Sequence, residues 1–256
     1  MTRKIAIANQ KGGVGKTTTC LTLAACLARQ QRSVLVIDCD PQASASRWLG
    51  FTRSRAAFLE DVLAGRTRLA AAVHPTRLAN LALVPASQEL AVQDRFLAAR
   101  RGGETVLRQK IDQQLGGSFQ YILFDCPPQL GMLSLNALAA AGEVIVPVAP
   151  EPMALDGLAR LFDTISLVQR RLNPGLRIAG ILLFRVRSGT VLSRQVANAL
   201  AERFPDLLFP TCIRETVRAA EAPSHHQTLI DYAPLCSASA DYWSFARAVL
   251  AQEEAS

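Results

Sequence analysis

A glycine-rich run that carries two lysines and two threonines is the stretch of this sequence best suited to chemistry. It lies between a short apolar run at residues 4–8 and a helical pattern that begins near residue 16. Glycine backbone can adopt positive φ and bring several N–H groups close to one anion, and a helix start adds partial positive charge. The run therefore predicts a phosphate-binding loop made of Lys11, Gly12, Gly13, Val14, Gly15, Lys16, Thr17 and Thr18.

Two side chains in this loop have types suited to a polyphosphate. Lys16 can reach the outer phosphates as a point charge, and the Thr17 hydroxyl can ligate Mg²⁺. The loop departs from the common phosphate-loop pattern, because Gln10 stands where the first glycine would be and Lys11 precedes a glycine pair. Two of only four lysines lie here, where a compact ammonium is useful. The alternative is a plain glycine turn between a strand and a helix.

Acidic residues end two other apolar runs. Residues 33–38 are apolar up to Asp38, with Asp40 close behind, and residues 121–125 are apolar up to Asp125. Open α/β sheets bind ligands at the carboxyl ends of their strands, so these acids are candidates for the same site as the loop. The alternative for Asp38 and Asp40 is that they cap a following helical turn.

Apolar runs alternate with helical patterns along the whole chain of 256 residues, with no linker, repeat or charge block between them. This order predicts an α/β fold, a doubly wound, mostly parallel sheet flanked by helices, in a single domain over residues 1–256. We expect strands at residues 3–8, 33–38, 81–85, 121–125, 143–149, 177–184 and 207–213. We expect helices at residues 16–31, 58–64, 88–100, 104–115, 131–141, 153–172, 192–204 and 238–252.

The bulk properties narrow the class of protein. The net charge is +7 with a pI near 9.4, which favours a polyanionic partner such as nucleic acid, although arginine-rich composition alone would give the same value. The six cysteines are scattered with no CxxC pair, so we expect reduced thiols and no metal ligation. No apolar run is long enough to cross a bilayer and no leader precedes the first strand, so we expect a cytosolic protein.

Taken together, the motifs resemble those of the ParA/MinD family of P-loop ATPases, which carry a deviant Walker A loop Lys-Gly-Gly-x-Gly-Lys-Thr. Residues 38–42 resemble its Asp-x-Asp-Pro-Gln motif, and residues 121–125 resemble a Walker B strand. The resemblance implies ATP and Mg²⁺ as ligands. It implies that Lys11 reaches the nucleotide of a partner subunit while Lys16 binds its own. It further implies that Thr17, Asp38 and Asp125 support the Mg²⁺ and that Asp40 orients the attacking water.

The C-terminal part extends the resemblance through Glu-Ala-Pro-Ser-His at residues 221–225. It implies a homodimer that forms with ATP and binds DNA non-specifically through Arg218, with Arg185 or Arg187 as a second contact. A ParB-like or other activating adaptor protein would then trigger hydrolysis and release. We expect such a protein to lie in the cytoplasm on the nucleoid. The alternative for Arg218 is an ion pair with a nearby glutamate, and the family's Pro-Arg-Asn run is replaced by Ile-Arg-Glu at residues 213–215.

Three other functions compete with a partition or positioning ATPase. A membrane-cycling ATPase of the MinD type needs a basic amphipathic C-terminal helix, whereas residues 252–256 are acidic, so we expect no membrane partner. A cluster-carrying reductase of the nitrogenase-iron-protein type needs paired cysteines. An inactive DNA-binding or scaffold module would not need the lysines and aspartates that the chain retains. The cargo, whether plasmid, chromosome or another assembly, has no signature in the sequence.

Overall fold

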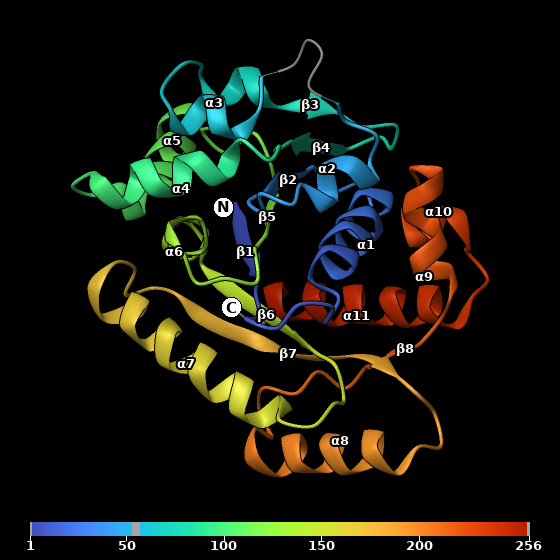
Figure 1. Cartoon of the computed structure of the whole chain (residues 1–256). Coiled ribbons are helices and arrows are strands. Elements are labelled where there is room, and N and C mark those ends of the chain that lie inside the picture. Colours follow the sequence, from blue (N-terminus) through green and yellow to red (C-terminus); the bar gives the residue numbers. More distant parts are fainter. Residues whose placement is uncertain (1, 53–56, 255–256) are drawn as a thin grey trace.

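The protein forms one eight-stranded sheet with helices on both faces (Figure 1). The structure is a computed structural model that describes residues 2–52 and 57–254. The strand order is β3-β4-β2-β5-β1-β6-β7-β8, and every neighbouring pair is parallel except β3 and β4. The expected fold class, a doubly wound and mostly parallel sheet flanked by helices, is confirmed.

The strands are β1 (Arg3–Ile7), β2 (Val34–Asp38), β3 (His74–Pro75), β4 (Leu81–Val84), β5 (Tyr121–Asp125), β6 (Glu143–Val148), β7 (Arg177–Val186) and β8 (Ile213–Arg214). The α-helices are α1 (Lys16–Arg29), α2 (Ser44–Trp48), α3 (Leu59–Leu63), α4 (Leu90–Ala99), α5 (Val106–Gln114), α6 (Met132–Ala140), α7 (Ala154–Arg171), α8 (Val191–Arg203), α9 (Arg218–Glu221), α10 (Leu229–Tyr232) and α11 (Ser237–Glu254). Short 3₁₀ turns lie at Leu69–Ala72, Gly103–Thr105 and Ala222–His225.

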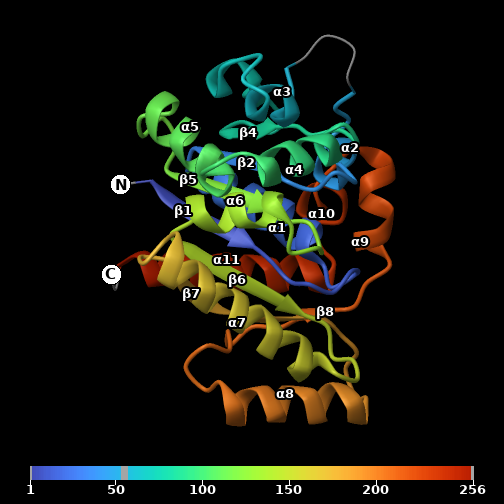
Figure 2. The same ribbon diagram turned by 60° about the vertical axis from the view of Figure 1, so that its left-hand side comes forward.

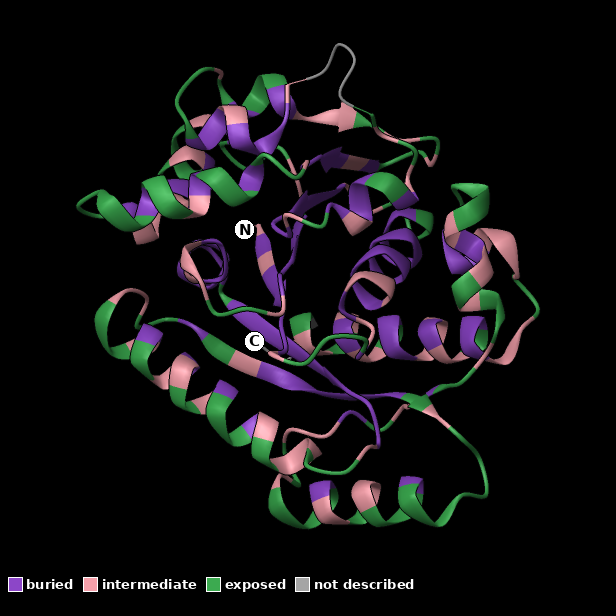
Figure 3. Cartoon of the chain, viewed as in Figure 1, coloured by how far each residue is buried: buried purple, intermediate pink, exposed green. Residues whose placement is uncertain are grey.

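Two hydrophobic layers lie on the two faces of the sheet. One is formed with α3 to α8, and the other with α1, α2, α10 and α11. Figure 2 shows α6 and α7 on one side of the strands with α1 and α11 behind them. The central strands β2 and β5 are buried along their whole length, as Figure 3 shows in purple. Burial on both faces explains why these strands are continuous apolar runs instead of alternating ones.

The strand register brings the two acidic strand ends together. Asp38 and Asp125 are paired residues in the parallel ladder of β2 and β5, and Ile7 pairs with Asp125 on the other side. Since β1, β2 and β5 end at the same edge, the glycine loop after β1 and the acids after β2 and β5 share one side of the molecule. This arrangement follows from strand order, which the sequence pattern does not contain.

The last predicted strand, residues 207–213, is wrong in its extent. Only Ile213–Arg214 pairs as β8, and Leu208 makes a single isolated bridge with Ile181. Pro210 has no N–H to donate, which interrupts pairing between these points. Strand β7 is longer than expected and runs to Val186, so it includes Arg185, which the sequence placed in a loop. Pairing with β8 extends it.

Three elements lay outside the sequence-based expectations. The antiparallel strand β3 at the sheet edge, helix α2 after the Asp40 segment, and the α9–α10 region carry weak patterns because each has two to five residues. Elements this short are stabilised by tertiary packing more than by their own periodicity. Among the described residues, no helix is long and apolar enough to cross a membrane.

Candidate nucleotide-binding site

The glycine loop leads directly into the start of α1. Gly13 and Gly15 have φ of 75° and 83°, in the left-handed region that side chains other than glycine rarely adopt. Gly15 is the N-cap, no side chain caps the first turn, and that turn contains no acid. The backbone N–H groups at the start of α1 are therefore available to an anion in front of them, where the helix dipole also favours negative charge.

Three hydrogen bonds hold the loop, two within it and one to the end of β6. The buried Asn9 side chain donates from Nδ2 to the Pro147 carbonyl at 2.8 Å and accepts from the Lys11 N–H at 3.0 Å through Oδ1. The Lys16 ammonium donates to the Lys11 carbonyl at 2.9 Å. Asn9 thus connects the loop to the end of β6. Sequence reasoning missed this role, because nothing in the motif shows that β6 lies beside β1.

The underside of the loop packs on an aromatic ring from β7. A Cβ added to Gly15 would lie only 2.4 Å from the Phe184 ring, so glycine is required here by contact as well as by φ. Gly12 and Gly13 have no atom within 4 Å of an added Cβ and lie on the open side of the loop. The loop therefore has a packed face against β7 and an open face that a phosphate can occupy.

The three predicted acids occupy distinct positions at the strand ends. Asp38 is fully buried, and its Oδ2 accepts from both the N–H and the hydroxyl of Ser46, at 2.9 and 2.7 Å. Its Oδ1 accepts from the Asp40 N–H at 3.1 Å. Asp38 thus supports α2 and the turn that carries Asp40, which is the structural alternative considered for it. Asp40 in turn accepts from the Gln42 N–H at 2.8 Å, and it lines the cavity in front of the loop.

Asp125 is the acid whose environment best fits a cation. It is fully buried, and among the described residues neither of its oxygens has a donor in hydrogen-bond geometry. Burial raises the pKa of Asp125 well above its usual range and the charge of Asp38 adds to this, while the Thr17 hydroxyl and Lys16 lower it. Burial likewise raises the pKa of Asp38 to about 6, against the Ser46 hydrogen bonds. A buried carboxylate without a partner is costly unless a cation joins it.

The residues present fit Mg²⁺ held together with a nucleotide. Asp125 and the Thr17 hydroxyl supply oxygen atoms close to the phosphate loop, and Mg²⁺ usually keeps several waters and takes few protein ligands beside substrate phosphates. No group of three or more His, Cys, Asp or Glu side chains that could hold a metal occurs in residues 2–52 and 57–254. The site therefore suits a metal that arrives with phosphates better than a metal held by the protein alone.

A cavity of about 690 Å³ opens in front of the loop. It is lined by the loop glycines, Lys16, Thr17 and Asp40, and also by Trp48, Ala219 and Tyr242. Lys16 is buried, and burial lowers its pKa, although Asp125, Cys126 and Asp40 oppose this by favouring its charged form. The lining combines polar groups suited to phosphates with aromatic side chains suited to a flat base, and the volume is that of a cavity that can take a nucleotide.

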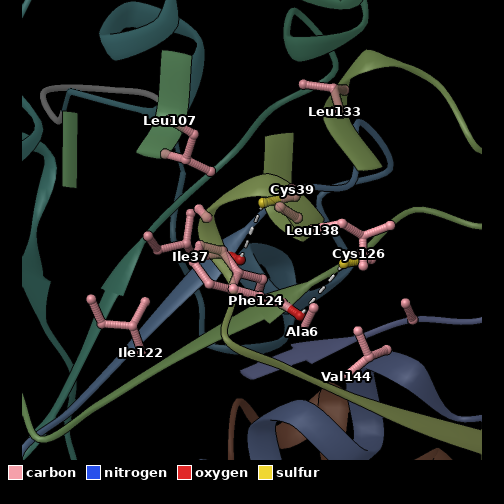
Figure 4. Packing of buried hydrophobic residues seen from close by; sticks show 14 of the residues in the cluster. Ala6, Ile37, Cys39, Leu107, Ile122, Phe124, Cys126, Leu133, Leu138 and Val144 are labelled. Carbon is pink, nitrogen blue, oxygen red and sulfur yellow. Dashed lines mark hydrogen bonds between the residues drawn. The ribbon is translucent and has the colours of Figure 1, made fainter. Parts of the chain in front are cut away.

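Cys39 and Cys126, which follow Asp38 and Asp125 in the sequence, lie in the hydrophobic layer on one face of the sheet. Cys39 and Cys126 point into the hydrophobic layer between the sheet and α6, beside Leu138 and Phe124 (Figure 4). Their thiols contact the Ile37 and Phe124 carbonyls at 3.7 and 3.8 Å. Burial raises the pKa of both thiols, which makes them poor nucleophiles and poor metal ligands. They act here as small core residues.

Of the three arginines proposed for DNA contact, Arg185 and Arg187 lie near the end of β7 and Arg218 begins α9, and each is paired with a glutamate. Arg185 is 2.9 Å from Glu151, Arg187 pairs with Glu215, and Arg218 is 2.8 Å from Glu221. The last pair is the structural alternative considered for Arg218. All three side chains are exposed, and their role with DNA stays a prediction.

Comparison with known proteins agrees with this geometry. Residues 2–178 match the family described as an AAA domain. The chain is 38% identical over 252 residues to the sporulation initiation inhibitor protein Soj of Bacillus subtilis, covering 98% of this chain and 99% of that protein. It is 39% identical over 253 residues to the chromosome partitioning protein ParA of Caulobacter vibrioides, covering 98% and 95%. The chain belongs to the ParA/Soj family of chromosome-partitioning ATPases.

Solved structures that resemble this ParA/Soj chain include proteins with bound nucleotide. The Mycobacterium smegmatis protein described as cobyrinic acid a,c-diamide synthase, with bound ADP and magnesium, is 35% identical with a TM-score of 0.86, covering 99% of this chain and 96% of that one. The MinD protein of Pyrococcus horikoshii complexed with Mg-ADP is 26% identical with a TM-score of 0.79, covering 97% and 96%. Relatives of this chain thus bind nucleotide with magnesium.

Proposed function

We propose that this ParA/Soj chain is an ATP-dependent partition or positioning ATPase, acting as one domain in the cytoplasm and associated with the nucleoid. The observation that carries the proposal is the buried, unpartnered Asp125 carboxylate beside Thr17 at the mouth of a phosphate-binding loop. A Mg²⁺ bound with ATP would satisfy that carboxylate. A scaffold without ATP would leave these two buried carboxyl oxygens, which lack partners among the described residues, unexplained.

The site residues divide the reaction between them. Lys16 and the N–H groups at the start of α1 would hold the phosphates of ATP, while Thr17 and Asp125 would hold the Mg²⁺ that accompanies it. Mg²⁺, when bound, neutralises phosphate charge. Asp40 lies at the same cavity with one oxygen held by the Gln42 N–H, which leaves its other oxygen to orient the attacking water. A water aligned by one carboxylate gives slow hydrolysis until an activator adds charge stabilisation.

A homodimer and non-specific DNA complete the proposed cycle. The Lys11 side chain is 46% exposed at the open face of the loop, so a facing subunit's phosphates can reach it. Arg185, Arg187 and Arg218 are exposed and could exchange their glutamate partners for DNA phosphates, contacts that need no base readout. A ParB-like or other adaptor would then stimulate hydrolysis and release. The Caulobacter vibrioides relative is a chromosome partitioning protein, which supports a chromosome as the cargo.

The alternative, a membrane-cycling ATPase of the MinD type, is less well supported by the last helix. The apolar residues of α11, including Tyr242, Phe245 and Val249, are fully buried against α1 and the sheet. Near its end, Gln252 donates to the Ala179 carbonyl at 3.0 Å. A membrane-binding helix needs a free apolar face, and α11 uses its apolar face inside the protein.

Gel shift on random-sequence DNA, with and without ATP and across a salt series, tests the proposal. We expect binding only with ATP and a steep loss with salt. Lys16→Ala should abolish nucleotide-dependent dimers, and Asp40→Ala should trap them on DNA, while Lys110→Ala on α5 should behave as wild type. Binding that is independent of ATP, or absent at low salt, contradicts the proposed function. Normal hydrolysis by Asp40→Ala contradicts its role with water.

A further inference from the structure

The lysine expected to cross to a partner subunit is bound within its own. The Lys11 Nζ lies 2.5 Å from Oε2 of Glu151, which follows the end of β6. Both side chains are partly exposed, 46% for Lys11 and 33% for Glu151, so the pair lies at the surface and can open. Nothing in the family motif pairs these residues, and Glu151 has no signal of its own in the sequence.

The chain path on both sides of Glu151 fixes its backbone in place. The Glu151 N–H donates to the Ala149 carbonyl at 2.8 Å, and the Glu151 carbonyl accepts from the Ala154 N–H at 3.2 Å. Met153, two residues on, has a left-handed φ of 63° as the N-cap of α7. Left-handed backbone at a residue with a side chain is unfavourable and persists only where the surrounding structure requires it. The Glu151 backbone is therefore held in a defined tight turn.

A second cation shares the same carboxylate. Arg185 contacts Oε1 of Glu151 at 2.9 Å, while Lys11 uses Oε2. Arg185 also has a left-handed φ of 62°, at the irregular pairing of β7 with β8, and it immediately follows the Phe184 ring that packs under Gly15. When Lys11 leaves, the Glu151 carboxylate is still paired with Arg185. The Lys11 contact can therefore open at little cost.

We propose that Glu151 is a positioning residue that holds Lys11 in its own subunit until nucleotide draws two subunits together. The inference rests on the proposed function, in which Lys11 binds the phosphates of the facing subunit. Glu151 competes with those phosphates for one ammonium, so it raises the ATP-bound protein concentration at which dimers form. Lowering of the Glu151 pKa by the Lys11 hydrogen bond, and further by Arg185, agrees with a formed contact.

The size of the effect follows from the exposure of the pair. Exposed ion pairs change an equilibrium by about 1.4- to 5-fold. Freeing one Lys11 should therefore raise its reactivity by about 1.4- to 5-fold. A symmetric dimer uses two copies of Lys11, so the dimer dissociation constant should fall by the square of the single effect, about 2- to 25-fold.

Amine acylation of the nucleotide-free protein, followed by mass spectrometry, measures the contact directly. The chain has four lysines, so each can be followed, and Lys110 serves as an internal reference. We expect Glu151→Gln to raise acylation of Lys11, and Glu151→Asp, which keeps the charge, to restore most of the protection. Asp112→Asn is the matched control, because Asp112 pairs with Lys4 at 2.9 Å and should expose Lys4 without changing Lys11. Unchanged Lys11 acylation in Glu151→Gln overturns the proposal.

Sedimentation of the same proteins with ATPγS and Mg²⁺ tests the consequence. We expect Glu151→Gln to dimerise at lower protein concentration than wild type, and Asp112→Asn to match wild type. Equal or weaker dimerisation of Glu151→Gln, while the wild type dimerises normally, overturns the role of Glu151 and leaves the proposed function standing. Failure of the wild type itself to dimerise overturns the proposed function, and the role of Glu151 falls with it.

Discussion

Replacing Gly15 by alanine tests the physical basis of the loop. Gly15 has φ of 83°, and an added Cβ would lie 2.4, 2.5 and 2.6 Å from three atoms of the Phe184 ring. Contacts this short force the ring or the loop to move. Gly12→Ala is the matched control, because an added Cβ there meets no atom within 4 Å and Gly12 is not among the positive-φ glycines.

The expected destabilisation has two sources. A left-handed conformation costs an alanine about 1–2 kcal/mol. Forcing a methyl group into a packed contact costs about 1–3 kcal/mol more. We therefore expect Gly15→Ala to lower the free energy of unfolding of the nucleotide-free protein by about 2–5 kcal/mol. Gly12→Ala should change it by no more than about 0.5 kcal/mol, as for surface substitutions.

Urea unfolding of the nucleotide-free protein measures these values, and a double-mutant cycle separates the two sources. Phe184→Ala removes the ring, so in its background Gly15→Ala should lose the contact part and retain only the backbone part. The coupling between the two substitutions should be about 1–3 kcal/mol. If Gly15→Ala is as stable as Gly12→Ala, or if the two substitutions are additive, the packing argument for this loop is refuted.

Three further predictions follow from other contacts. Asn9→Ala should lower the free energy of unfolding by about 1–3 kcal/mol in urea titrations and should slow ATP hydrolysis, because the Pro147 carbonyl loses its donor and the loop loses its anchor. Burial and a hydrogen bond to Glu253 raise the pKa of Tyr121 to about 12, above the usual value of about 10. The contribution of the Tyr121 hydroxyl to the free energy of unfolding is therefore present below pH 10 and lost as the pH rises towards 12. Urea midpoints should therefore favour the wild type over Tyr121→Phe at pH 8 and much less at pH 11; an equal difference at both values would contradict the assignment. Removing Mg²⁺ with EDTA should abolish hydrolysis in a phosphate-release assay but leave the nucleotide-free unfolding midpoint unchanged, since the described residues contain no group of three or more His, Cys, Asp or Glu side chains that would hold the metal without phosphates.

Much of the sheet could be predicted from local pattern. Strand β5 matches the expected boundaries residue for residue, and β1, β2, β4 and β6 differ by one residue at an end. These central strands bury both faces, so each is a short continuous apolar run bounded by polar residues, which a sequence shows directly. Errors gathered at the β7–β8 edge, where two-residue pairing and a proline decide the strand ends.

The sequence predicted which residues form the candidate site, but it predicted only some of their contacts. Lys16, Thr17, Asp40 and Asp125 were expected from residue type and order, and the structure brings them to one edge of the sheet. Asp38 was expected to support the Mg²⁺, with capping of the following helical turn as the alternative. Its hydrogen bonds to Ser46 connect it to α2, and its role with the metal stays a prediction. Each of the three arginines forms an ion pair with a glutamate, and the sequence predicted such a pair only for Arg218.

The amino-acid sequence by itself determined the kind of chemistry and the class of fold, because glycines, lysines and apolar runs act through neighbours a few residues away. Tertiary structure alone decided that Asn9 ties the loop to β6, that Phe184 packs under Gly15, and that Glu151 holds Lys11. These contacts join residues about 140 to 170 positions apart. Their existence depends on strand order and register, which bring distant segments together without leaving a local pattern in the chain.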